Sequence, residues 1–144
     1  RLACDPAWPD GLALGETKTV AGFEFTAVPA AHETLTPATV GYVVKAGPHV
    51  IYHSGDTLLY DGMADHLKPL GIDVALLPIN GKVGNMNHVD AAWLGKQIGA
   101  RLVIPCHYDM FWFNTADPAD FAAAAEKMKT PYRILALGER IIYP

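Results

Sequence analysis

Three polar residues that lie far apart in the sequence each follow an apolar run typical of a β-strand: His32, Asp56 and His107. A rigid strand end holds a metal ligand steady, and the loop beyond it leaves room for a substrate. Imidazole and carboxylate groups together suit zinc, manganese or iron. We therefore predict a metal site formed by these three side chains. A purely structural role for each histidine is the alternative that the residue types leave open.

The residue patterns that would position these side chains begin with two β-hairpins in the first half of the chain. Runs of β-branched and aromatic residues flank Ala21-Gly22 and Ala46-Gly47-Pro48, which are turn sequences. The four predicted strands are Thr17–Val20, Phe23–Val28, Thr39–Lys45 and His49–His53. The segment before them, Arg1 to Glu16, is rich in Pro and Gly and is predicted to be irregular.

Strands and helices alternate in the second half. Two wholly apolar runs, Val74–Ile79 and Leu102–Cys106, are typical of strands covered on both faces. Helices are predicted at Tyr60–Leu67, at Asp90–Ile98 after an Asn87 cap, and through Phe121–Met128 after Asp117-Pro118. A last hairpin, Arg133–Leu137 with Arg140–Tyr143, is predicted to turn at Gly138-Glu139. This order predicts one α/β domain over residues 1–144, with mixed strand directions, sheet packed on sheet, and outer helices.

The composition indicates a globular domain and excludes several classes of function. Hydrophobic residues make up 51% and charged residues 18% of the 144 positions, which is ample for one core. The net charge is -4 without a basic cluster, so we expect no binding to nucleic acid. No apolar run reaches the roughly 18 residues of a membrane span. Two cysteines, Cys4 and Cys106, are too few for a disulfide framework and indicate a cytoplasmic protein with reduced thiols.

The sequence around the three candidate ligands resembles a known family. Val-Pro-Ala-Ala-His-Glu at 28–33, Ser-Gly-Asp-Thr at 54–57 and Ile-Pro-Cys-His-Tyr-Asp at 104–109 are similar to the later metal motifs of the metallo-β-lactamase superfamily. Within that superfamily they are most similar to the L-ascorbate-6-phosphate lactonase-like group. Asn85-Met86-Asn87 and Trp112-Phe113-Asn114 strengthen this resemblance.

The resemblance implies a fold and a set of roles. The fold would be the C-terminal half of an αββα sandwich, with a mixed, largely antiparallel sheet and outer helices. His32 would bind a first metal ion, His107 a second, and Asp56 would bridge both and act as the catalytic residue that orients the nucleophile. The metal would be zinc or manganese, dinuclear in the complete enzyme. The family's earlier His-x-His-x-Asp-His element does not occur in this sequence, so we expect this chain to be the C-terminal portion of the fold.

Other polar residues near these motifs have two readings each. His88, Tyr108 and Asn114 are predicted to contact the substrate, although His88 could equally cap a helix or face solvent. Asp109 could line the same pocket or orient an imidazole. Cys106 next to His107 suggests a thiol–imidazole pair, but neighbours on a strand point to opposite faces, which favours Cys106 in the core.

Two functions of different classes follow from these predictions. The first is a metal-dependent hydrolase in which a metal-activated hydroxide attacks a small ester, lactone or phosphorylated substrate. The second is an inactive half-domain that acts as an assembly or binding module and needs an N-terminal partner segment for catalysis. The expected partners are therefore a small-molecule substrate and either a second copy of the chain or the missing N-terminal half.

Overall fold

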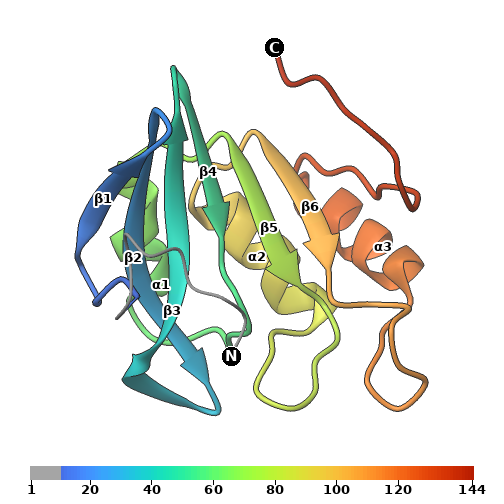
Figure 1. Ribbon diagram of the computed structural model, residues 1–144. Coiled ribbons are helices and arrows are strands. Elements are labelled where there is room, and N and C mark those ends of the chain that lie inside the picture. Colours follow the sequence, from blue (N-terminus) through green and yellow to red (C-terminus); the bar gives the residue numbers. More distant parts are fainter. Residues whose placement is uncertain (1–10) are drawn as a thin grey trace.

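The computed structural model describes residues 11–144, apart from the side chains of Thr36 and Pro37. Its centre is a six-stranded sheet whose strands lie side by side in sequence order (Figure 1). The strands are β1 (Thr17–Val20), β2 (Phe23–His32), β3 (Thr34–Ala46), β4 (His49–His53), β5 (Val74–Pro78) and β6 (Leu102–Cys106). The α/β class and the mixed sheet are as predicted, and β6 has the bounds that its apolar run predicted.

The mode of strand pairing changes once across the sheet. Strands β1 to β4 pair antiparallel, whereas β4, β5 and β6 pair parallel. Because β2 and β4 are both antiparallel to β3, they run the same way as each other and as β5 and β6. The carboxyl ends of these four strands therefore meet at one edge of the sheet, which is the lower edge in Figure 1.

The helices cover one face of the sheet (Figure 1). They are α1 (Met63–Leu67), a short 3-10 helix η1 (Lys68–Leu70), α2 (His88–Gln97) and α3 (Pro118–Met128). Both predicted caps form: Asn87 accepts hydrogen bonds from the first turn of α2, and Asp117 accepts one from the first turn of α3. Within residues 11–144, every helix is too short to cross a bilayer.

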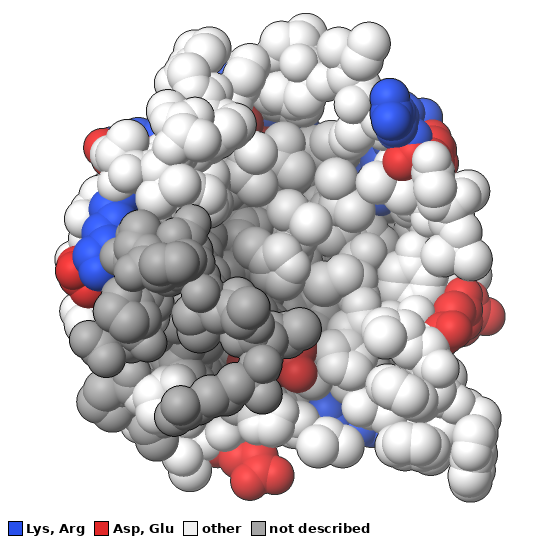
Figure 2. All heavy atoms as spheres, viewed as in Figure 1, with Lys and Arg blue, Asp and Glu red and all other residues white. Residues whose placement is uncertain are grey.

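The core lies between the helices and the face of the sheet that they cover. Alternate strand residues point into it, as the pleat requires. The buried strand residues of this cluster are Val28, Val43, Tyr52, Ala75, Leu77 and Val103, and the helices add Met63, Leu67, Ala91, Ala92, Leu94, Phe121 and Ala125. On the other face, residues of β4 and β6 such as Ile51 and Ile104 are only partly buried. Figure 2 shows that the charged side chains on this open face lie mostly at its rim.

Two predictions about the strands were wrong. Residues 133–137 and 140–143 do not form a hairpin, although the predicted turn exists, with the Glu139 amide donating to the Ala136 carbonyl at 3.0 Å. The Glu139 carboxylate accepts from the Ala136 amide and pairs with Arg133, so the turn is satisfied locally. An isolated two-stranded hairpin is marginal without further packing. The expected second sheet is also not formed by residues 11–144, because all six strands join one sheet.

Several element boundaries differ from the predicted ones, and the differences in β2, β3 and α1 are the largest. Strand β2 continues beyond Val28 to His32, and β3 begins at Thr34, because these residues pair across a tight turn. Helix α1 begins at Met63 and not at Tyr60. The extension of β2 matters for the site, because it places His32 in the sheet and not in a loop after it.

Helix α2 packs closely on β6 at Gly95. A Cβ atom at Gly95 of α2 would overlap with the Val103 side chain of β6. We expect Gly95→Ala to lower the free energy of unfolding by about 1–3 kcal/mol, because the helix must move away from the sheet. Urea denaturation measures this change. Combining it with Val103→Ala should cost less than the sum of the two single changes, and strict additivity would contradict the contact.

Candidate metal centre

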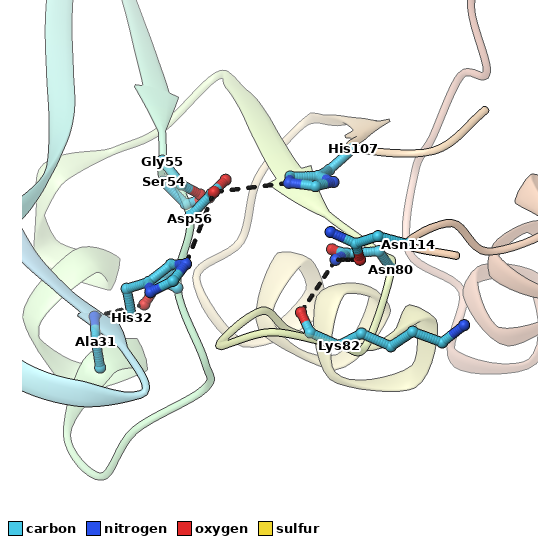
Figure 3. Close-up of polar contacts among 10 residues, drawn as sticks. Ala31, His32, Ser54, Gly55, Asp56, Asn80, Lys82, His107 and Asn114 are labelled. Atoms are coloured by element: carbon cyan, nitrogen blue, oxygen red, sulfur yellow. Dashed lines mark hydrogen bonds and ion pairs between the residues drawn. The ribbon is translucent and has the colours of Figure 1, made fainter. Parts of the chain in front are cut away.

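The strand ends bring the three predicted ligands together. Asp56 lies between the two imidazoles, as Figure 3 shows. Its Oδ2 atom is 3.6 Å from Nε2 of His107 and 3.9 Å from Nε2 of His32. His32 lies 24 positions before Asp56 in the sequence and His107 lies 51 positions after it, yet both imidazoles face the same carboxylate oxygen.

These separations have a chemical meaning. Both are too long for a hydrogen bond, which needs about 2.7–3.2 Å between nitrogen and oxygen. Two atoms bound to the same tetrahedral zinc ion at about 2.0–2.1 Å lie about 3.3 Å apart. Among residues 11–144, however, no group of three or more His, Cys, Asp or Glu side chains is arranged to enclose a metal ion. The three side chains therefore form part of a ligand set. Each imidazole lies close to the Asp56 carboxylate, but the three donors do not together enclose one ion.

His32 is held by the last pairs of β2. The register of β2 against β3 shifts between Pro29 and Ala31, and such a bulge redirects the side chains that follow it. The Ala31 amide then donates to the buried Thr57 hydroxyl at 2.8 Å. This bond ties the residue before His32 to the residue after Asp56, so the two candidate ligands cannot drift apart independently.

Asp56 follows β4 in a short segment that is anchored on both sides. The Ser54 amide donates to the Leu76 carbonyl of β5 at 3.2 Å, which extends the parallel pairing. The Gly55 amide donates to Nδ1 of His53 at 3.0 Å. His53, the last residue of β4, thus fixes the turn before Asp56. The Asp56 carboxylate itself remains half exposed and open to a ligand.

His107 occupies a strained position directly after β6. Its φ is +62°, a left-handed conformation that costs a non-glycine residue roughly 1–2 kcal/mol. The Cys106 carbonyl before it accepts from the Ile79 amide at 3.1 Å. The Nδ1 atom of His107 is buried and has no hydrogen-bond partner among the described residues. Strain of this kind is typical of functional sites.

Cys106 is not suited to act as a nucleophile. Burial raises the pKa of its thiol to about 12, and the nearby Asp56 carboxylate adds to this effect. The thiolate is the reactive form, and it is scarce at neutral pH when the pKa is this high. The structure therefore disfavours the thiol–imidazole pair, and Cys106 is a partly buried free cysteine. Cys4 lies outside the described residues.

The predicted substrate contacts come from the start of α2 and from the chain that follows His107. For His88, Tyr108 and Asn114 the described residues give no hydrogen bond or ion pair to His32, Asp56 or His107. His88 is the first residue of α2, and Tyr108 packs against the core, where burial raises the pKa of its phenol. Their contact with a substrate stays a prediction.

A hollow of about 350 Å³ opens beside the candidate ligands. His32 and Asp56 form one side of it, and Tyr42 with neighbouring residues of β3 forms the other. A space of this size admits a small molecule next to the Asp56 carboxylate.

Three residues that support the site were missed by the sequence analysis: Thr57, Asn80 and Gly84. Thr57 was part of a recognised motif but had no assigned role. Asn80 is buried at the end of β5, and its side-chain amide donates to the Asn114 Oδ1 atom at 2.6 Å. Gly84 lies against His32. Asn80 could have been noticed in the sequence, because it is a polar residue directly after the apolar run 74–79.

Known proteins with similar sequences and structures are named as metal-dependent hydrolases. A UPF0173 metal-dependent hydrolase of Pyrobaculum aerophilum is 38% identical over 112 residues, which is 78% of this chain and 49% of that protein. One from Opitutus terrae is 40% identical over 101 residues, 70% of this chain and 44% of that protein. The chain spans about half the length of these curated relatives.

A solved structure agrees with this relationship. Igni18, a metallo hydrolase from Ignicoccus hospitalis, superimposes with a TM-score of 0.76 and 28% sequence identity, over 90% of this chain and 58% of that one. Residues 9–108, which include all three candidate ligands, match the sequence profile of the beta-lactamase superfamily domain. The chain therefore belongs to the metallo-β-lactamase superfamily.

Proposed function

We propose that this chain contributes His32, Asp56 and His107 to the metal centre of a metal-dependent hydrolase. The observation that carries this proposal is the approach of both imidazoles to one Asp56 oxygen, at 3.6 and 3.9 Å. The family membership and the names of the relatives support it. Because the chain spans about half of those relatives, the proposal concerns the protein that contains the complete ligand set.

Each ligand has a distinct role in this proposal. His107 and His32 would each bind one divalent ion, zinc or manganese, and Asp56 would bridge the two. Such ions supply an activated water and stabilise negative charge that develops on the substrate. The Asp56 carboxylate would orient the attacking water, and no serine or cysteine nucleophile is needed. Neutral imidazole and a carboxylate are the ligands expected for these metals.

The proposed substrate is a small ester, lactone or phosphorylated sugar acid, as the resemblance to the lactonase-like group implies. It would occupy the hollow beside His32 and Asp56, with His88, Tyr108 and Asn114 as further contacts. The cytoplasm is the proposed compartment, since the chain's two cysteines are too few for a disulfide framework.

A specific observation favours a second candidate, a binding module. The face of the sheet opposite the helices presents partly exposed apolar residues: Val44 pairs with Ile51, and Leu76 pairs with Ile104. Contiguous apolar surface of this kind indicates an interaction site. A second copy of the chain, or a segment that supplies further ligands, would cover this face.

Substitution of the bridging carboxylate tests the metal centre. We expect Asp56→Asn to weaken zinc binding by more than about tenfold, since it removes the only charge that both imidazoles face in the described site. Titration calorimetry with zinc on the purified chain measures the affinity, and hydrolysis by the complete protein should be lost. Asp65→Asn, which changes the same charge on α1, is the matched control.

Equal zinc affinity of Asp56→Asn and the unchanged chain would contradict the bridging role. If the unchanged chain bound no zinc and formed a tight dimer by sedimentation, the binding module would replace the enzyme as the favoured function.

The high pKa of Cys106 gives a separate prediction. In a Cys4→Ser background, iodoacetamide should modify Cys106 far more slowly at neutral pH than it modifies free glutathione, because almost no thiolate is present. Mass spectrometry follows the reaction. Cys106→Ala should retain most of the hydrolysis of the complete protein, and a folded but inactive variant would restore the thiol as a catalytic candidate.

A further inference from the structure

We propose that the loop formed by residues 80–87 is a positioning element that fixes the relative placement of all three candidate ligands. It contacts the segment that carries each of them. The inference rests on the proposed function for its meaning, but the contacts can be tested without a metal.

The first contact is with His32. Gly84 has a φ of +77°, and a Cβ atom on it would lie 2.7 Å from the Glu33 amide nitrogen and 3.1 Å from Nδ1 of His32. The backbone of the loop therefore lies directly against one edge of this imidazole. Any side chain at Gly84 would have to displace either the ring or the turn that follows it.

The second contact is with the segment after Asp56. The Met86 amide donates to the Thr57 carbonyl at 2.7 Å. Both residues are fully buried, so water does not compete for this bond. The same threonine receives the Ala31 amide through its hydroxyl. The loop is thereby joined to the bond network that sets the distance between His32 and Asp56.

The third contact is with the segment after His107. Asn80 is 4% exposed, and its Nδ2 atom donates to Asn114 Oδ1 at 2.6 Å and to the Lys82 carbonyl at 3.1 Å (Figure 3). The Lys82 ammonium also reaches the Phe113 carbonyl at 3.5 Å. These bonds fasten the chain that leaves His107, whose own backbone is strained and would otherwise relax.

Hydrogen bonds within the loop hold its backbone in one shape. Asn80 and Asn87 pair at its base as an isolated β-bridge, and the Gly81 amide donates to the Met86 carbonyl at 2.9 Å. The Asn80 Oδ1 atom and the His107 Nδ1 atom are both buried without a partner among the described residues. Metal-binding histidines usually donate their second N–H to such an acceptor. We therefore assign Asn80 as the residue that positions His107, through one bridging water molecule.

A pair of glycine variants separates positioning from general stability. Gly84→Ala and Gly15→Ala introduce the same methyl group at φ values of +77° and +79°, but only the first meets neighbouring atoms. In the metal-free chain, the ring-nitrogen NMR signals of His32 should move in Gly84→Ala and stay in place in Gly15→Ala. Asn80→Ala should move the His107 signals more than those of His32.

Zinc affinity provides the second measurement. Loss of residues that orient metal ligands typically costs about 10–100-fold in affinity, so we expect losses of that size for Gly84→Ala and Asn80→Ala and less than about twofold for Gly15→Ala. Unmoved ring signals in both folded loop variants, or equal shifts in Gly15→Ala, would overturn the positioning role. Should Gly84→Ala fail to fold, Asn80→Ala decides alone. A chain that binds no zinc but shows the predicted NMR shifts would refute the metal centre and retain the positioning role.

Discussion

The buried hydroxyl of Thr57 is the contact on which the geometry of the site depends. It accepts the Ala31 amide at the end of β2 and donates to the Leu58 carbonyl, both at 2.8 Å. The hydroxyl thus donates to one backbone group and accepts from another, and the residue is fully buried, so solvent does not compete for these bonds. Because an unsatisfied buried amide costs about 1–3 kcal/mol, the two strand ends are held in one relative position. The backbone around His32 and Asp56 therefore fixes where these two residues lie relative to each other.

The direction of the strands then determines where the third ligand can arrive. If β5 and β6 ran antiparallel to β4, His107 would leave the sheet at the opposite edge. Parallel pairing requires a crossover, and α2 supplies it between β5 and β6. The loop that leads into this helix is the same one that touches His32, Thr57 and Asn114. The connection needed to keep β6 parallel thus also passes through the site, which explains why Asn80 and Asn85 within it are buried although they are polar.

The sequence predicted the local features of this arrangement well. The strand at Leu102–Cys106 and the cap at Asn87 were predicted correctly because an apolar run and a capped helix start leave strong patterns in neighbouring residues. The expected cover on both faces was wrong for β6, whose alternate residues are only partly buried. The three candidate ligands could be picked out from the sequence because each follows an apolar run. The final hairpin failed because its pattern, including Gly138, describes a turn but cannot reveal whether a neighbouring strand exists. The role of Gly84 could not be predicted for a similar reason: it contacts His32, which lies 52 positions earlier in the sequence.

Strand order that follows chain order has a consequence for how this sheet is formed. Each strand pairs with the one made just before it. The antiparallel pairs from β1 to β4 close short loops and lose little entropy, whereas the parallel pairs of β4 with β5 and of β5 with β6 close longer ones and are expected to form more slowly. Since His107 enters only with the last strand, we expect the edge that gathers the imidazoles to be completed at the end of folding, when the hairpins that carry His32 and Asp56 are already in register.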